Sequence, residues 1–160
     1  MRIYHNYHAQ THRFANKEII EMFLFQLIKE IGFGLVSVFV PIYLYTQGVP
    51  LLTIMIAFTV RSALHGLFAF LVSRQILVKV GIKHTFVASM LLYAAAFFVI
   101  QHDVSPAIIW TWVLLSGFTN ALYASAHHAY LALNVDAHSA GKQVATLSIV
   151  ATFAGIVTPF

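Results

Sequence analysis

The sequence predicts an all-α, polytopic membrane protein, and three observations support this fold class. First, 60% of the 160 residues are hydrophobic and only 9% are charged, whereas a soluble domain carries roughly 25% charged residues. Second, the chain contains several apolar runs close to the roughly 20 residues that a helix needs to cross a bilayer. Third, these runs lack the alternating pattern of strands, and only helices or closed barrels can span lipid.

Glycine, proline and polar residues divide the chain into a tail and five apolar segments. Residues 1–21 predict a polar N-terminal tail, and residues 22–160 predict a partial helical domain. Residues 47–50 and 102–106 predict short turns, because Gly and Pro there cannot continue a helix. A basic connector follows the second segment, and a polar loop precedes the fifth. The expected helices cover about 22–46, 51–73, 85–101, 107–133 and 144–160. Because the last helix ends without a polar flank, we expect the chain to be a fragment of a longer protein.

The distribution of Lys and Arg predicts the orientation of the chain. The N-terminal tail and the second and fourth connectors together carry seven of these residues, and the first and third connectors carry none. Because Lys and Arg concentrate on the cytoplasmic side, we expect a cell (inner or plasma) membrane protein with a cytoplasmic N-terminus. The net charge of +4 therefore reflects topology, and no nucleic-acid partner is expected. The absence of cysteine excludes disulfides and thiolate metal sites.

The basic connector resembles the signature G-x-L-A-D-R-x-G-R-K of the major facilitator superfamily of secondary transporters. Three positions match, namely the first basic position, the second glycine and the last basic position, at Lys79, Gly81 and Lys83. Three positions differ, because the family has a glycine, an acid and an arginine where this chain has Arg74, Val78 and Ile82. The resemblance covers about residues 19–160.

The resemblance implies a bundle of about twelve helices, of which this chain supplies about the first five. It further implies a transporter that moves a small solute by alternating access, with the basic loop as a cytoplasmic latch. The implied partners are the lipid bilayer, a small-molecule substrate and the C-terminal helices missing from this sequence. Neither an enzymatic activity nor a cofactor is expected.

Arg61 is the most unusual residue of the apolar segments, because it lies near the middle of the second one. An ionisable group there costs roughly 2.5–3.5 kcal/mol on insertion scales. His65 follows one helical turn later and therefore shares its face. Two interpretations stay open. Arg61 either binds an anionic substrate or counter-ion in a central cavity, or it is a structural residue paired with a carboxylate or with carbonyl groups.

Lys29 and Glu30 lie near the cytoplasmic end of the first segment. The favoured interpretation is an interfacial helix start from which Lys29 extends to the headgroups. The alternative makes Glu30 the partner of Arg61 or a protonatable coupling group. Trp110 and Trp112 lie near an outer helix end and are interpreted as interfacial anchors.

The fourth segment carries small and polar residues at helical spacing, namely Gly117, Asn120, Ala124 and His128. Close helix packing is the favoured interpretation, with Asn120 forming a hydrogen bond across the interface. His128 is a candidate for handling a proton or the substrate. No metal site is expected, because the adjacent residues His127 and His128 point about 100° apart on a helix.

Three hypotheses about function follow. The favoured one is a fragment of a secondary active transporter, with Arg61, His65 and Asn120 near a substrate site at the membrane midplane. The alternative is a stand-alone small multi-pass membrane protein that acts as a subunit or assembly factor. The third is an intramembrane enzyme or haem protein that uses the histidines.

Overall fold

The structure, a computed structural model, describes residues 24–34, 38–134, 141, 145, 148–149 and 152–153. These residues form helices and turns and contain no strand, which confirms the predicted all-α class for this part of the chain. The predicted tail, Lys142 and most of the predicted fifth helix lie outside the described residues. The labelled elements are α2 (Leu51–Leu71), the π-helix η1 (Val72–Ile76), α3 (Leu77–Val80), α4 (Ile82–His102) and α5 (Pro106–Asn134).

Within the described residues, four helices are long and apolar enough to cross a membrane. They cover Leu24–Thr46, Leu51–Leu71, Ile82–His102 and Pro106–Leu133, the first of them including residues 35–37, which are not described. The chain divides into two compact units, and one of them, Pro41–Tyr130, contains α2, α4 and most of α5. The candidate site lies in this unit.

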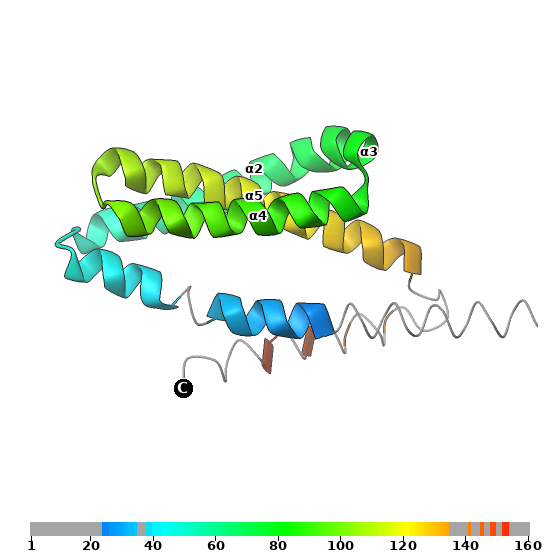
Figure 1. The fold of residues 1–160 in the computed structure, drawn as a ribbon, viewed down its shortest axis with the longest axis horizontal. Helices are drawn as coiled ribbons and strands as arrows, with labels where there is room; N and C mark the ends of the chain where they lie inside the picture. Colours follow the sequence, from blue (N-terminus) through cyan, green and yellow to red (C-terminus); the bar gives the residue numbers. More distant parts are fainter. Residues whose placement is uncertain are drawn as a thin grey trace, which may run out of the picture. The chain divides into compact units, whose positions relative to one another are not determined.

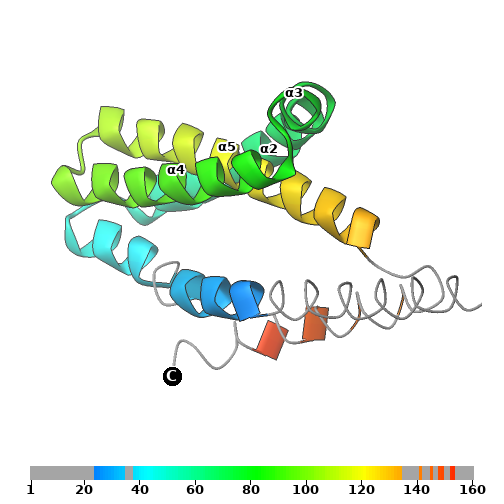
Figure 2. The same ribbon diagram turned by 45° about the vertical axis from the view of Figure 1, so that its right-hand side comes forward.

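Helix α5 forms the centre of the Pro41–Tyr130 unit. Figures 1 and 2 show α2, α4 and α5 side by side, with α4 running opposite to the other two. Aromatic pairs join α5 to both neighbours, with ring centroids 5.2–5.5 Å apart: Phe58–Trp112, Phe68–Phe118 and Phe86–Tyr123. Because α5 packs against two helices, it carries much of the buried surface of the unit, including Trp112, Val113, Ala121 and Ala126.

The turn before α2 ends the preceding helix with a Schellman motif. The N–H of Val49 donates to the carbonyl of Leu44 over 3.1 Å, and that of Gly48 donates to Tyr45 over 3.0 Å. Gly48 has a φ of +85°, a conformation that glycine adopts without strain. Pro50 then precedes the first residue of α2, where a missing N–H costs no helical hydrogen bond.

The basic connector differs from the sequence expectation because most of it is helical. The helix that begins at Leu51 continues through η1 and α3 to Val80, and α4 begins at Ile82 instead of residue 85. The break is confined to Gly81, which has φ +83° and ψ 157°. Apolar residues between the charges favour continuation of the helix, and only glycine occupies this backbone region without strain.

Serine and threonine side chains of α2, α4 and α5 form hydrogen bonds to backbone carbonyls of the preceding helical turn. Each hydroxyl donates to a carbonyl three or four residues earlier, as seen for Thr59, Ser62, Thr85, Ser89, Thr111, Ser116 and Thr119. A polar group in hydrocarbon needs such a partner. These residues are therefore compatible with a membrane-spanning position.

Candidate functional site

Arg61 lies at the centre of α2 and contacts two aromatic rings. Its guanidinium carbon is 5.7 Å from the ring centroid of Phe58 and 5.7 Å from that of Trp112. Phe58 precedes Arg61 by about one turn of α2, and Trp112 belongs to the second turn of α5. The two rings lie 5.5 Å apart at an angle of 59°, so they form an aromatic surface beside the cation.

Gly117 brings α5 against the backbone of α2 at the same level. A Cβ atom added at Gly117 would lie 3.1 Å from the Cβ of Leu64 and 3.2 Å from the carbonyl oxygen of Arg61. Both distances are shorter than ordinary van der Waals contact. The missing side chain of Gly117 therefore allows the close approach that places Trp112 beside Arg61.

Two buried nitrogen atoms at this contact have no hydrogen-bond partner among the described residues. They are the Nε of Arg61 and the Nε1 of Trp112. Trp112 is 2% exposed, whereas Arg61 is half-buried. Both atoms are N–H donors, so the missing group is an acceptor in each case.

The aromatic contacts offset part of the cost of placing Arg61 in an apolar span. Each cation–π contact contributes about 0.5–1 kcal/mol when exposed and about 2 kcal/mol when desolvated, against an insertion cost of roughly 2.5–3.5 kcal/mol. Aromatic rings do not accept the five guanidinium N–H groups in the way that oxygen atoms do. The charge is therefore partly stabilised, and its hydrogen-bonding capacity is left unused within the described residues.

Of the other predicted residues, His65 lies close to Gly117, whereas Asn120 faces a different helix. The backbone N of His65 would be 3.6 Å from a Cβ atom at Gly117, and its ring is half-buried. Asn120 instead faces α4, where its Oδ1 accepts a hydrogen bond from the hydroxyl of Tyr93. This agrees with the packing interpretation of Gly117 and Asn120, and it joins α5 to both neighbouring helices.

His128 is exposed, and the centroid of its ring lies 5.6 Å from that of the His127 ring. Among the described residues, no group of three or more His, Cys, Asp or Glu side chains is arranged to hold a metal ion. No contact joins His128 to Arg61 or His65 in that part of the chain. His128 is therefore not part of the Arg61 contact.

Glu30 is engaged on its own helix. Its Oε1 accepts hydrogen bonds from Nε2 of Gln26 over 2.8 Å and from Nζ of Lys29 over 2.9 Å. The second contact is also an ion pair between side chains that are 12% and 25% exposed. Pairing of Glu30 with Arg61 stays a prediction, because the two residues belong to different units.

The three residues that match the family signature flank the break between α3 and α4. Lys79 lies in α3 and Lys83 in the first turn of α4, and both are exposed. Gly81 separates them with its left-handed backbone. The arrangement presents two positive charges at one end of the Pro41–Tyr130 unit, opposite to the turns at Gly48 and Asp103.

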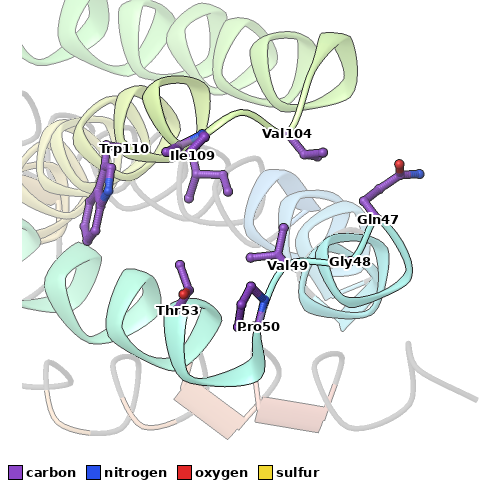
Figure 3. A pocket seen from close by; sticks show the side chains of 9 residues that line it. Gln47, Gly48, Val49, Pro50, Thr53, Val104, Ile109 and Trp110 are labelled. Carbon is purple, nitrogen blue, oxygen red and sulfur yellow. The ribbon is translucent and has the colours of Figure 1, made fainter.

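A pocket of about 280 Å³ lies at that opposite end. Figure 3 shows Thr53 and Trp110 extending from two helices toward it, together with the backbone turn at Gly48. None of the residues predicted to bind or couple a substrate lines this pocket. Arg61 follows Thr53 by eight residues, or about 12 Å along the helix axis, so the pocket and the Arg61 contact are separate features.

The sequence interpretation of Trp112 as an interfacial anchor is wrong. Trp110 is 39% exposed and fits that role, but Trp112 is 2% exposed and packs against α2. The two residues differ because positions two apart on a helix point about 200° away from each other. Trp112 is a site residue that sequence reasoning missed, and no spacing signals it, because a position five residues before Gly117 lies about 140° away around the helix.

Comparison with known proteins found no matching family model, no matching curated protein and no matching solved structure. Chemical interpretation therefore rests on the residues themselves. A guanidinium and an indole N–H between two apolar helices can bind an acceptor, and neither group is a nucleophile or a general base. The arrangement favours binding over catalysis.

Proposed function

We propose that the chain is the N-terminal part of a secondary active transporter that moves a small solute across the membrane by alternating access. One observation carries the proposal: Arg61 lies mid-span, and its buried Nε has no hydrogen-bond partner among the described residues. A charge in an apolar span that has neither an ion-pair nor a hydrogen-bond partner among the described residues favours a function in a substrate or ion pathway. The solute would complete the site when it binds.

The resemblance to the major facilitator superfamily supports the same proposal at the basic end. Lys79 and Lys83 are exposed around Gly81, which is the arrangement expected of charges that contact a neighbouring segment. In this proposal the basic end faces the cytoplasm of a cell membrane, since Lys and Arg are enriched there. The remaining helices of the transporter follow after Phe160.

Uptake by the complete protein tests this function. Proteoliposomes with the wild-type protein should accumulate a solute from a labelled panel, and Arg61→Ala should abolish uptake while the amount of protein in the membrane stays the same. The matched control is Ser62→Ala, which changes an exposed neighbour whose hydroxyl bonds only to its own helix. Uptake retained in Arg61→Ala would contradict the proposal.

The reading frame beyond Phe160 separates this function from a stand-alone subunit or assembly factor. Continuation into about seven further apolar segments supports the transporter. A stop codon directly after Phe160 would contradict it and favour the smaller protein.

A further inference from the structure

We infer that the transported solute is a small carboxylate, bound jointly by the guanidinium of Arg61 and the indole N–H of Trp112. This inference rests on the proposed function and deepens it by naming the substrate class. It assigns a recognition role to Trp112, which neither the family signature nor the sequence pattern indicates.

The hydrogen-bond donors at this contact require a ligand that carries acceptors. At this contact, the two buried atoms without a hydrogen-bond partner among the described residues, Arg61 Nε and Trp112 Nε1, are both donors. No described carboxylate forms an ion pair with Arg61, and the described ion pair of the chain joins Lys29 to Glu30. A ligand that satisfies both donors must offer at least two acceptor lone pairs, and a negative charge would also neutralise the guanidinium.

The number of charges favours a carboxylate over a phosphate. Arg61 is the one Lys or Arg within the described parts of α2, α4 and α5 that lies away from their ends. One permanent cation balances a monoanion, whereas a phosphate dianion would leave an unpaired negative charge in hydrocarbon. A planar carboxylate also matches the fork of the guanidinium.

The surroundings of the donors define the rest of the ligand. The rings of Phe58 and Trp112 cover one side of the guanidinium. Arg61 is half-buried, so part of its side chain is accessible, although its Nε is buried. The rings exclude water from the bound carboxylate and thereby strengthen its hydrogen bonds. A short aliphatic acid, with an apolar body and one charged end, fits this environment.

Fluorescence of Trp112 tests binding directly, because the chain has two tryptophans. In Trp110→Phe, Trp112 is the only tryptophan of these 160 residues. Titration of the purified protein in detergent with sodium propionate should change its emission in a saturable way. The neutral isostere propionamide should leave the emission unchanged. Emission that is insensitive to propionate, or equally sensitive to both compounds, would overturn the inference.

Two variants separate recognition from folding. Trp112→Phe keeps an aromatic ring beside Arg61 but removes the N–H, so calorimetric affinity for propionate should fall about tenfold, as expected for a lost hydrogen bond to a charged group. Arg61→Gln should abolish binding, and Arg61→Lys should retain part of it. Undiminished affinity in a folded Trp112→Phe protein would overturn the role of Trp112.

The uptake and binding experiments distinguish failure of the proposed transport function from failure of the carboxylate inference. Propionate binding without any solute uptake by the complete protein would contradict the transport function and leave the carboxylate site intact. Uptake of a neutral solute by a protein that does not bind propionate would contradict the carboxylate inference and leave transport intact.

Discussion

Gly117 sets the distance between α5 and α2 beside Arg61. The carbonyl oxygen that a Cβ atom would meet at 3.2 Å belongs to the α2 backbone, which cannot move aside as a flexible side chain can. A larger residue at Gly117 must therefore push the helices apart. Separation would also withdraw Trp112 from the guanidinium.

We expect Gly117→Val to destabilise the protein by about 1–3 kcal/mol, the range for overpacking a close contact. Unfolding in detergent, followed by circular dichroism, measures the change. The control is Gly66→Ala, because Gly66 also lies in a long apolar helix, α2, but has no atom within 4 Å of an added Cβ. Equal stability of the two variants would contradict the close approach at Gly117.

The pKa of Asp103 depends on hydrogen bonds within the turn before α5. The hydroxyl of Ser105 and the N–H of Val104 donate to its carboxylate and lower the pKa of Asp103 below its ordinary value. A group with a lowered folded-state pKa contributes stability above its unfolded pKa of about 3.9. That contribution is lost as the pH falls through the folded pKa.

An NMR titration of the carboxyl carbon of Asp103 should therefore give a midpoint below that of an unfolded peptide. Ser105→Ala should raise the pKa of Asp103 toward the ordinary value, because the carboxylate loses the hydrogen bond from the Ser105 hydroxyl. Ser105→Thr keeps the hydroxyl and should leave the midpoint unchanged. A midpoint unaffected by Ser105→Ala would contradict the hydrogen bond.

At the residue scale, the sequence identified Arg61 but not its neighbours. A charge in an apolar run is visible without a structure, whereas the partner of that charge depends on how α5 is rotated about its axis. Because α5 is apolar around most of its circumference, its periodicity does not determine this rotation. Trp112 and Phe58 were therefore found only from the packed helices.

At the scale of elements, helix ends could be predicted where glycine or proline interrupts the chain. The turns at residues 47–50 and 103–105 follow that rule. The connector after α2 does not, because its apolar residues sustain helix between scattered charges and the chain reverses at one residue, Gly81. Counting charges located the connector and overestimated its length.

Gly81→Ala tests whether this single residue holds the reversal between α3 and α4. Its φ of +83° and ψ of 157° belong to a region that is essentially restricted to glycine, and other residues there cost about 1–3 kcal/mol. We expect a loss of stability of that size in detergent unfolding. Gly66→Ala is again the control and should be neutral or slightly stabilising. A neutral Gly81→Ala would contradict the sharp reversal.

At the scale of the whole molecule, composition determined the class more securely than any motif. The described residues form helices and turns and include four helices of spanning length, as the low share of charged residues predicted. Sidedness is a prediction of the Lys and Arg distribution, and the family remains a proposal.

The crossing of the membrane by α2, α4 and α5 is the central claim, and substituted-cysteine labelling tests it most directly. The chain has no cysteine of its own, so single cysteines at the exposed positions Gln47, Gln75 and Asp103 are unambiguous reporters. In intact cells, a membrane-impermeant maleimide should label Gln47→Cys and Asp103→Cys, and it should label Gln75→Cys only after permeabilisation. Equal labelling of all three variants in intact cells would contradict the account.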